Sequence, residues 1–329
     1  MLETEVDNMK NRIVMYSGGK GSFAVADYVK THYPDDNILL YFTDTKWEHP
    51  DLYRFLYEGA DALELPLLIH ADGRDPVQLM FENRVLFNSR IGQCSIVLKA
   101  GVSSDYIRKG KIPNEEKWFN KEYLKSDDIL DEPILYFGID WTEEHRSHAI
   151  KKNWAPYQVE LPLIDNMIDE DEILVKHSIK QPRLYELGFQ HNNCFGRCVK
   201  AGQGHFKNLH AKLPEVFQKT KEQEHHLRVF VSMWHGIKDM EEDWHFAKED
   251  KKALQEELDA AYRPYFYYEA ERPEVFIAPS RMENYSFMKK MRNKVTAPYA
   301  LRDLEADIKE EPQQIDMFDI GGCGCFIDM

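Results

Sequence analysis

The stretch RIVMYSGGKGSFAVADYV, residues 12–29, decides the fold. It opens with an apolar run at 12–16, passes through a glycine-rich turn, and continues with apolar residues at helical spacing. Consecutive glycines let the backbone direct several N–H groups towards one anion, and a following helix adds the positive end of its dipole. We therefore predict a strand, a phosphate-binding turn and a helix, in this order.

The turn contains the residues that we expect to hold the phosphates of a nucleotide: Ser17, Gly18, Gly19, Lys20, Gly21 and Ser22. Lys20 supplies a positive charge, and Ser22 stands where it can cap the helix or contact a phosphate oxygen. The glycine spacing differs from that of the Walker loop and from the dinucleotide-binding fingerprint. The alternative is a glycine-rich turn that binds nothing.

Length and charge limit the classes of protein to consider. The 329 residues suffice for one full α/β domain and a smaller region. The net charge is −15 and the pI is about 5.4, so the chain as a whole is unsuited to wrapping nucleic acid. The first eleven residues are polar and acidic, and no apolar run reaches the length of about eighteen residues that a membrane span needs. We expect a cytoplasmic protein without membrane contact.

Strands and helices alternate after the glycine turn. Further apolar runs predict strands at residues 37–42, 66–70, 133–138 and 158–163. Such alternation favours a parallel sheet with right-handed crossovers and a ligand at the carboxyl ends of the strands. The charged segment 109–132 is interpreted as an insertion.

The chain divides into two regions in this prediction. Residues 1–164 form a nucleotide-binding α/β domain, and residues 165–329 form an α-rich region with acidic helices. Within the second region, the aromatic segment 263–268 is interpreted as a short strand or a packing segment.

Four of the five cysteines form two glycine-flanked pairs. Cys194 and Cys198 have three residues between them, and Cys323 and Cys325 have one. Thiolates on tight turns can converge on one metal, so we expect these four to hold an iron–sulfur cluster or, as the alternative, zinc. Two unrelated pairs, the second in a redox tail, are the other interpretation. A disulfide framework is not expected in a reducing compartment.

Other residues are candidates by their place in the pattern. The lone Cys94 is a candidate for catalysis or sulfur transfer, with a core position as the alternative. Asp44 or Asp140 could hold Mg²⁺ and Arg146 could bind phosphate, unless Asp44 caps the next helix and residues 143–146 form a solvated helix face. A local basic group in the acidic chain suggests contact with a polyanion such as nucleic acid: Arg183, Arg197, Lys200 and Lys207.

Several motifs together resemble one superfamily. They are residues 17–22, Phe-Thr-Asp-Thr at 42–45, Cys94 followed by Leu98-Lys99, the segment 192–202 around the first cysteine pair, and Gly-Cys-Gly-Cys-Phe at 322–326. The chain resembles the phosphoadenosine phosphosulfate reductase-like group of PP-loop ATP pyrophosphatases, and within it the bacterial and phage branch described as adenine nucleotide α-hydrolase-like. Gly21 departs from the pattern, since most members carry Asp there.

The resemblance implies a HUP-like α/β fold and an enzyme that uses ATP and Mg²⁺. Those members that thiolate tRNA or DNA adenylate a substrate oxygen, release pyrophosphate and let sulfur displace AMP. We expect such a sulfurtransferase-like enzyme here, acting on a nucleotide or nucleic acid with a sulfur-donor protein, and with Lys20, Cys94 and Asp140 as catalytic residues.

Two other functions remain open. One is a sulfonucleotide reductase that is reduced by thioredoxin, although its single tail cysteine and its loop sequence differ from this chain. The other is a non-catalytic ATP-binding sensor or defence-system subunit, which Gly21 keeps open.

Overall fold

The computed structural model describes residues 9–310, except 89, 244–245, 272, 274–278, 280 and 293. These residues form two compact units. The first comprises residues 9–73 and 95–195, and the second comprises residues 74–94 and 196–310. The expected boundary after residue 164 thus falls inside the first unit.

The first unit contains a six-stranded sheet with the order β4-β3-β2-β1-β5-β6. All neighbouring strands are parallel except β4, which pairs antiparallel with β3 at the edge. The α/β class is therefore confirmed. The strands are β1 (Asn11–Met15), β2 (Asn37–Asp44), β3 (Leu67–Ala71), β4 (Glu115–Phe119), β5 (Ile134–Phe137) and β6 (Val159–Glu160).

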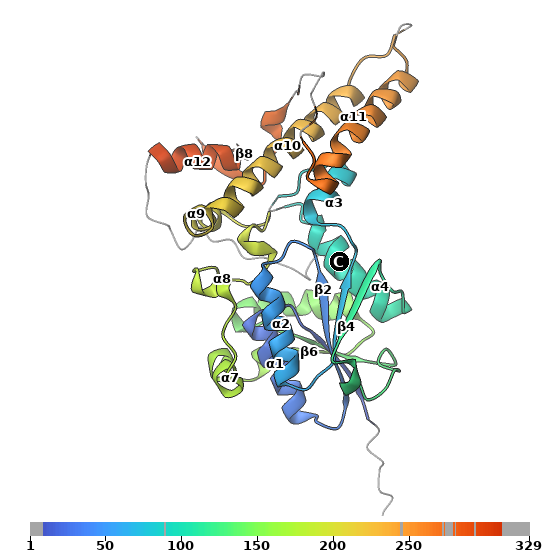
Figure 1. The fold of residues 1–329 in the computed structure, drawn as a ribbon, viewed down its shortest axis with the longest axis vertical. Helices are drawn as coiled ribbons and strands as arrows, with labels where there is room; N and C mark the ends of the chain where they lie inside the picture. Colours follow the sequence, from blue (N-terminus) through green and yellow to red (C-terminus); the bar gives the residue numbers. More distant parts are fainter. Residues whose placement is uncertain are drawn as a thin grey trace, which may run out of the picture. The chain divides into compact units, whose positions relative to one another are not determined.

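Helices cover both faces of this sheet (Figure 1). Successive residues of a strand point to opposite faces, so Val14 packs on one side of β1 and Ile13 on the other. The side of Val14 is covered by α1 (Lys20–His32), α2 (Pro50–Ala62) and α7 (Glu170–His177). The opposite side is covered by α4 (Val102–Lys109) and α5 (Ser147–Trp154). Near-continuous apolar strands are what two covered faces require.

Two predictions for the first unit were wrong in part. The charged segment 109–132 contains strand β4, whose exposed Glu115, Glu116 and Lys117 are typical of a protected sheet edge. The segment predicted as a strand at 158–163 pairs over only two residues, because Pro162 starts the short helix α6 (Pro162–Asp165). Other short elements here are η1 (Ser95–Gly101), η2 (Lys121–Tyr123), η3 (Trp141–Arg146), α8 (Arg183–Glu186) and η4 (Cys194–Gly196), whose last residue belongs to the second unit.

The second unit is built mainly from helices. Its long helices α10 (Pro214–Lys238) and α11 (Lys248–Tyr268) lie side by side and share aromatic contacts, such as Phe230 with Tyr262 and Phe266 (Figure 1). The segment 263–268 is thus the end of α11, not a strand, although Pro264 lies inside the helix. The other elements are α3 (Pro76–Asn83), α9 (Gln203–Lys212), η5 (Met282–Asn284), the hairpin of β7 (Met288–Arg292) and β8 (Val295–Tyr299), and α12 (Leu301–Glu310).

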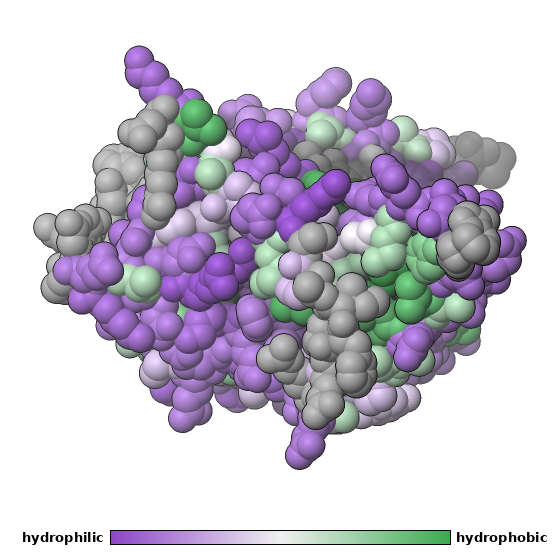
Figure 2. All heavy atoms as spheres, turned by 90° about the horizontal axis from the view of Figure 1, so that it is seen from above, coloured by the Kyte–Doolittle hydropathy of each residue, from purple (hydrophilic) through white to green (hydrophobic). Residues whose placement is uncertain are grey.

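The surface agrees with the polar composition. The mean hydropathy is −0.58, and the face in Figure 2 is covered mainly by hydrophilic residues. Within the described part of the chain, no helix combines the length and the apolar character needed to span a membrane.

Candidate phosphate-binding site

The predicted loop lies at the point where the order of the strands in the sheet reverses. The chain leaves β1 for β2 on one side, whereas β5 pairs with β1 on the other side. Open parallel sheets bind ligands at such a point, beyond the carboxyl ends of the strands. Residues 16–19 connect β1 to α1 there, so the predicted order of strand, turn and helix is confirmed.

Gly18 has a backbone conformation that favours glycine. Its φ is +79°, and a Cβ on it would lie 2.8 Å from Cγ of Leu52 in α2. From another side, the Asn192 amide donates a buried hydrogen bond of 2.7 Å to the Gly18 carbonyl. Packing against Leu52 and Asn192 therefore fixes the shape of the turn.

The start of α1 suits an anion. Gly19 is the N-cap and offers no side chain, and the first turn contains no acidic residue. The positive end of the helix dipole is thus not offset by the side chains of α1 itself. Ser22 is buried and its Oγ donates to the Gly19 carbonyl at 2.9 Å, whereas Ser17 is exposed.

Gly21 and Gly138 bring the end of β5 against the loop. A Cβ on Gly138 would lie 2.7 Å from the backbone nitrogen of Ser22, and one on Gly21 would lie 3.3 Å from the Gly138 carbonyl oxygen and 3.1 Å from Cδ1 of Leu163. A side chain at Gly138 would push the two segments apart, and one at Gly21 would need its neighbours to shift by a few tenths of an ångström. This packing gives a structural reason for glycine at position 21, and the sequence pattern alone did not indicate it.

Lys20 is paired with a residue far away in the sequence. Its Nζ lies 2.8 Å from Oδ1 of Asp171 in α7 and 5.2 Å from the ring centroid of Tyr185 in α8. Sequence reasoning missed both partners, since no local pattern links Lys20 to a carboxylate 151 positions downstream.

Asp44 and Asp140 lie at the ends of β2 and β5. Asp44 is buried, and its Oδ1 accepts hydrogen bonds from the Lys46 N–H at 2.7 Å and from the Tyr53 hydroxyl at 2.9 Å. Burial raises the pKa of this carboxyl. The alternative role of Asp44 as a helix cap is wrong, because His49 is the N-cap of α2.

Asp140 is the N-cap of the 3₁₀ turn η3. Its Oδ1 accepts hydrogen bonds from the Thr142 N–H at 2.8 Å and the Thr142 hydroxyl at 2.6 Å. It also lies close enough to Glu170 of α7 to affect that residue: burial raises the pKa of Glu170, Lys20 opposes this and Asp140 adds to it. Lys20, Asp140 and Glu170 therefore share one electrostatic environment.

Arg146 ends the same 3₁₀ turn. It is 7% exposed and forms an ion pair with Glu143. The alternative of a solvated helix face is therefore wrong for Arg146. Its expected contact with phosphate stays a prediction.

The first cysteine pair starts on an unusual turn. The φ angles of Cys194, Phe195 and Gly196 are +49°, +52° and +68°, a run of left-handed residues that costs about 1–2 kcal/mol for each non-glycine member. Such strain persists where surrounding contacts hold it, and it is often found at functional sites. The backbone N–H of Cys194 donates to Glu48, and the ring of Phe195 meets that of His49 edge-on at 4.5 Å.

Glu48 is a buried residue whose importance the sequence did not indicate. Its side chain is 1% exposed and accepts a 2.9 Å hydrogen bond from the Thr45 hydroxyl. The Lys99 Nζ lies 3.5 Å from Glu48 Oε1. Glu48 therefore connects the end of β2, η1 and the turn of Cys194 within the first unit.

The four-cysteine metal centre stays a prediction. Cys194 and Cys198 are buried thiols, and Cys323 and Cys325 lie outside the described residues. Among residues 9–310 as described, no group of three or more His, Cys, Asp or Glu side chains is arranged to hold a metal. Cys94 is also buried, at 9% exposure, and directly precedes η1.

The basic residues predicted to form a local group differ in exposure. Burial raises the pKa of Asp75, and the nearby charge of Arg197, which is 9% exposed, opposes this rise. Arg183 is exposed and belongs to the first unit, whereas Lys200 and Lys207 belong to the second.

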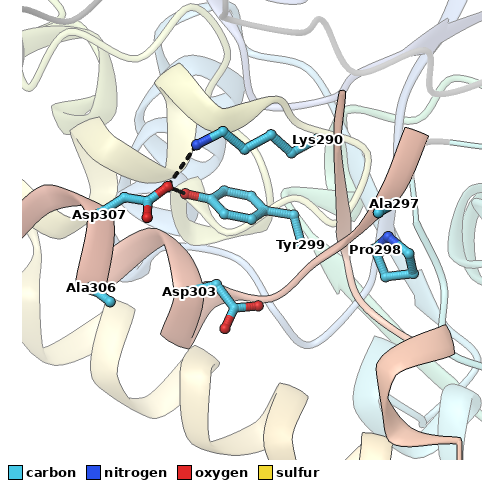
Figure 3. Close-up of a pocket in the computed structure, with 7 residues that line it drawn as sticks. All are labelled: Lys290, Ala297, Pro298, Tyr299, Asp303, Ala306 and Asp307. Atoms are coloured by element: carbon cyan, nitrogen blue, oxygen red, sulfur yellow. Dashed lines mark hydrogen bonds and ion pairs between the residues drawn. The ribbon is translucent and has the colours of Figure 1, made fainter. Parts of the chain in front are cut away.

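The described residues also form cavities, of which two lie beside strands of the two units. One of about 400 Å³ in the first unit is lined by Asp44, Tyr53, Tyr57 and residues of β3 and β4. The other, of about 290 Å³, lies between the β7–β8 hairpin and α12 of the second unit (Figure 3). There Asp307 accepts hydrogen bonds of 2.6 Å from Lys290 and from the Tyr299 hydroxyl.

Comparison with models of known protein families gives no match, and no curated protein is significantly similar to the chain.

Proposed function

We propose that the chain binds ATP at residues 17–22 and transfers its adenylyl group to an acceptor, with release of pyrophosphate. The reaction belongs to the PP-loop ATP pyrophosphatase class that the sequence resembles. We further propose that the acceptor is a nucleotide or nucleic acid and that the complete reaction is sulfurtransferase-like.

The observation that carries the proposal is the loop at the switch point of the sheet. Gly18 turns the chain at the end of β1, and α1 begins at Lys20 without an acidic first turn. One polyanion would then be bound by backbone N–H groups, by the helix dipole and by Lys20 once it leaves Asp171. The acceptor oxygen would attack the α-phosphorus, the bond to the β-phosphate oxygen would break, and the loop would stabilise the charge on the departing pyrophosphate.

Asp140 fits a magnesium ion better than Asp44 does. Asp140 is only half-buried and shares the electrostatic environment of Lys20, whereas Asp44 is buried and bonded to Lys46 and Tyr53. Mg²⁺ would supply neutralisation of the triphosphate charge. Asp140 would hold it beside the loop.

The thiols of the cysteines and the backbone turn at Cys194 support a role in sulfur chemistry. Cys194 starts a strained left-handed turn that Glu48 holds, and Cys198 follows it. Together with Cys323 and Cys325, these thiols would hold the iron–sulfur cluster or zinc. Metal and acid-labile sulfide analysis of anaerobically purified protein, with Cys194→Ser as the comparison, tests this part.

The test of the proposed function is the release of pyrophosphate from ATP, with a label on the α-phosphate followed into the adenylated acceptor or into AMP. Nucleotide and nucleic-acid fractions are offered as acceptors, because adenylyl transfer requires one. We expect Lys20→Ala to reduce pyrophosphate release by at least tenfold and Lys30→Ala, in the last turn of the same helix, to leave it unchanged. Undiminished release from folded Lys20→Ala protein would contradict the proposal.

The same assay distinguishes the other functions. Sulfite release from phosphoadenosine phosphosulfate and a thiol reductant would indicate the sulfonucleotide reductase instead. Tight ATP binding without AMP formation for any acceptor would indicate the sensor or defence-system subunit.

A further inference from the structure

The cation of the phosphate loop is already bound to an anion of the chain. Lys20 Nζ and Asp171 Oδ1 are 2.8 Å apart, and the Lys20 side chain is 19% exposed in this pair. Asp171 is 71% exposed and stands in the first turn of α7. A polyphosphate that uses Lys20 must therefore replace a carboxylate.

A second carboxylate of the same turn lies against the loop. Oε1 of Glu170 is 3.0 Å from the position that a Cβ on Gly21 would take. Burial raises the pKa of Glu170, whereas the nearby charge of Lys20 lowers it. The absence of a side chain at Gly21 thus leaves space that Glu170 uses, at the positive end of α1.

A third group comes from α8. The Tyr185 hydroxyl lies 3.0 Å from the position of a Cβ on Gly19. Burial raises the pKa of Tyr185 to about 12, and backbone hydrogen bonds from Lys20 and Asn192 oppose that rise. The Tyr185 side chain therefore lies against the start of α1, where a phosphate would bind.

We propose that the segment 170–185 is a built-in competitor of the nucleotide, in which Asp171 binds the Lys20 ammonium and the Glu170 and Tyr185 oxygens lie against the phosphate loop. This inference rests on the proposed function and adds regulation to the same site. A polyphosphate binds by displacing these oxygens, beginning with the Asp171 carboxylate.

The packing of α7 shows which part of the segment can move. Leu174 is buried in the core, and Lys176 and His177 bind Asp27 of α1 at 2.7 Å. The body of α7 is therefore anchored, whereas Asp171 can leave Lys20 by a change of its exposed side chain. Exposed ion pairs are weak, so the competitor adjusts nucleotide affinity by a few-fold and does not block binding.

The test is equilibrium binding of ATP to the full chain at low ionic strength. We expect Asp171→Asn to bind ATP about two- to fivefold more tightly than the unsubstituted protein, the range that an exposed pair can supply. Glu172→Gln is the matched control, because it removes the same charge from the same exposed turn. Its affinity should rise less than that of Asp171→Asn.

Inorganic tripolyphosphate is the second probe. Because competition occurs at the phosphates, Asp171→Asn should improve its binding by the same factor as that of ATP. The double variant Glu170→Gln/Asp171→Asn should bind both probes more tightly than the single variant.

The outcomes separate the two proposals. If Lys20→Ala weakens ATP binding but Asp171→Asn binds no more tightly than Glu172→Gln, the competitor is refuted and the proposed site stands. If ATP binding is absent or does not depend on Lys20, the proposed site fails, and the competitor fails with it.

Discussion

At the scale of single residues, glycines decide the geometry of the loop. Gly18 is required by its positive φ and by Leu52, and Gly138 by the close approach of β5 to α1, whereas a side chain at Gly21 would be tight. Lys20 then provides the charge at the start of α1. These residues come from positions 18–21 and 138 and meet at one point of the sheet.

Gly18→Ala tests this geometry, and Gly110→Ala is its matched control. Both glycines have positive φ, but a Cβ on Gly110 would meet nothing within 4 Å. We expect Gly110→Ala to lower the free energy of unfolding by about 1 kcal/mol from backbone strain alone. Gly18→Ala should cost about 1–3 kcal/mol more, because its Cβ also overlaps Leu52. Equal losses in urea unfolding would contradict the importance of the Leu52 contact.

At the scale of elements, most of the sheet could be predicted from the sequence. The apolar runs of β1, β2, β3 and β5 are unambiguous because both faces are covered. The edge strand β4 could not be predicted, because its charged residues resemble those of a loop. The end of α11 was also misjudged, since an aromatic run with Pro264 is typical of a strand or a break as much as of a helix.

The site was predicted less completely than the elements. The loop residues are contiguous, so their order could be read directly. The partners Asp171, Glu170, Tyr185 and Asn192 could not, because contacts of this kind depend on how distant segments pack in three dimensions. Glu48 follows Asp44 closely in the sequence, but nothing in the sequence indicated that Lys99 and the turn of Cys194 would contact it.

The Glu48–Lys99 pair makes a prediction for the elements that it joins. Lys99→Met removes only the ion pair of Glu48, whereas Glu48→Leu also removes the acceptor of the hydrogen bonds from Thr45 and from the Cys194 N–H. We expect Glu48→Leu to lower the free energy of unfolding by about 3–5 kcal/mol, and Lys99→Met to lower it by less. In urea unfolding, the double variant should lose less free energy of unfolding than the two single variants lose in sum. Strict additivity would show that the two side chains do not interact.

At the scale of the whole molecule, the chain passes three times between the two units within residues 9–310. The second unit contains a buried carboxylate of its own, Glu224 in α10. It accepts hydrogen bonds of 2.7 Å from the N–H groups of Phe287 and of Leu301. Glu224 thereby ties the hairpin region and the start of α12 to α10.

This carboxylate predicts a pH dependence for the second unit. Burial raises the pKa of Glu224 from 4.5 to about 7, so the folded state holds a proton that the unfolded state releases. Stability should therefore fall as the pH rises from 4.5 to 7, by up to about 3 kcal/mol from this group. Thermal unfolding between these pH values should depend less on pH in Glu224→Gln. If Glu224→Gln shows the same pH dependence of thermal unfolding as the unsubstituted protein, then other groups cause that dependence.

The most direct test of the central claim is hydrogen–deuterium exchange with and without ATP and Mg²⁺. If the phosphates bind the loop, amides in residues 17–23 should exchange more slowly with ATP, and Lys20→Ala should remove most of this protection. Protection that is absent there, or confined to other segments, would contradict a nucleotide site at the end of β1.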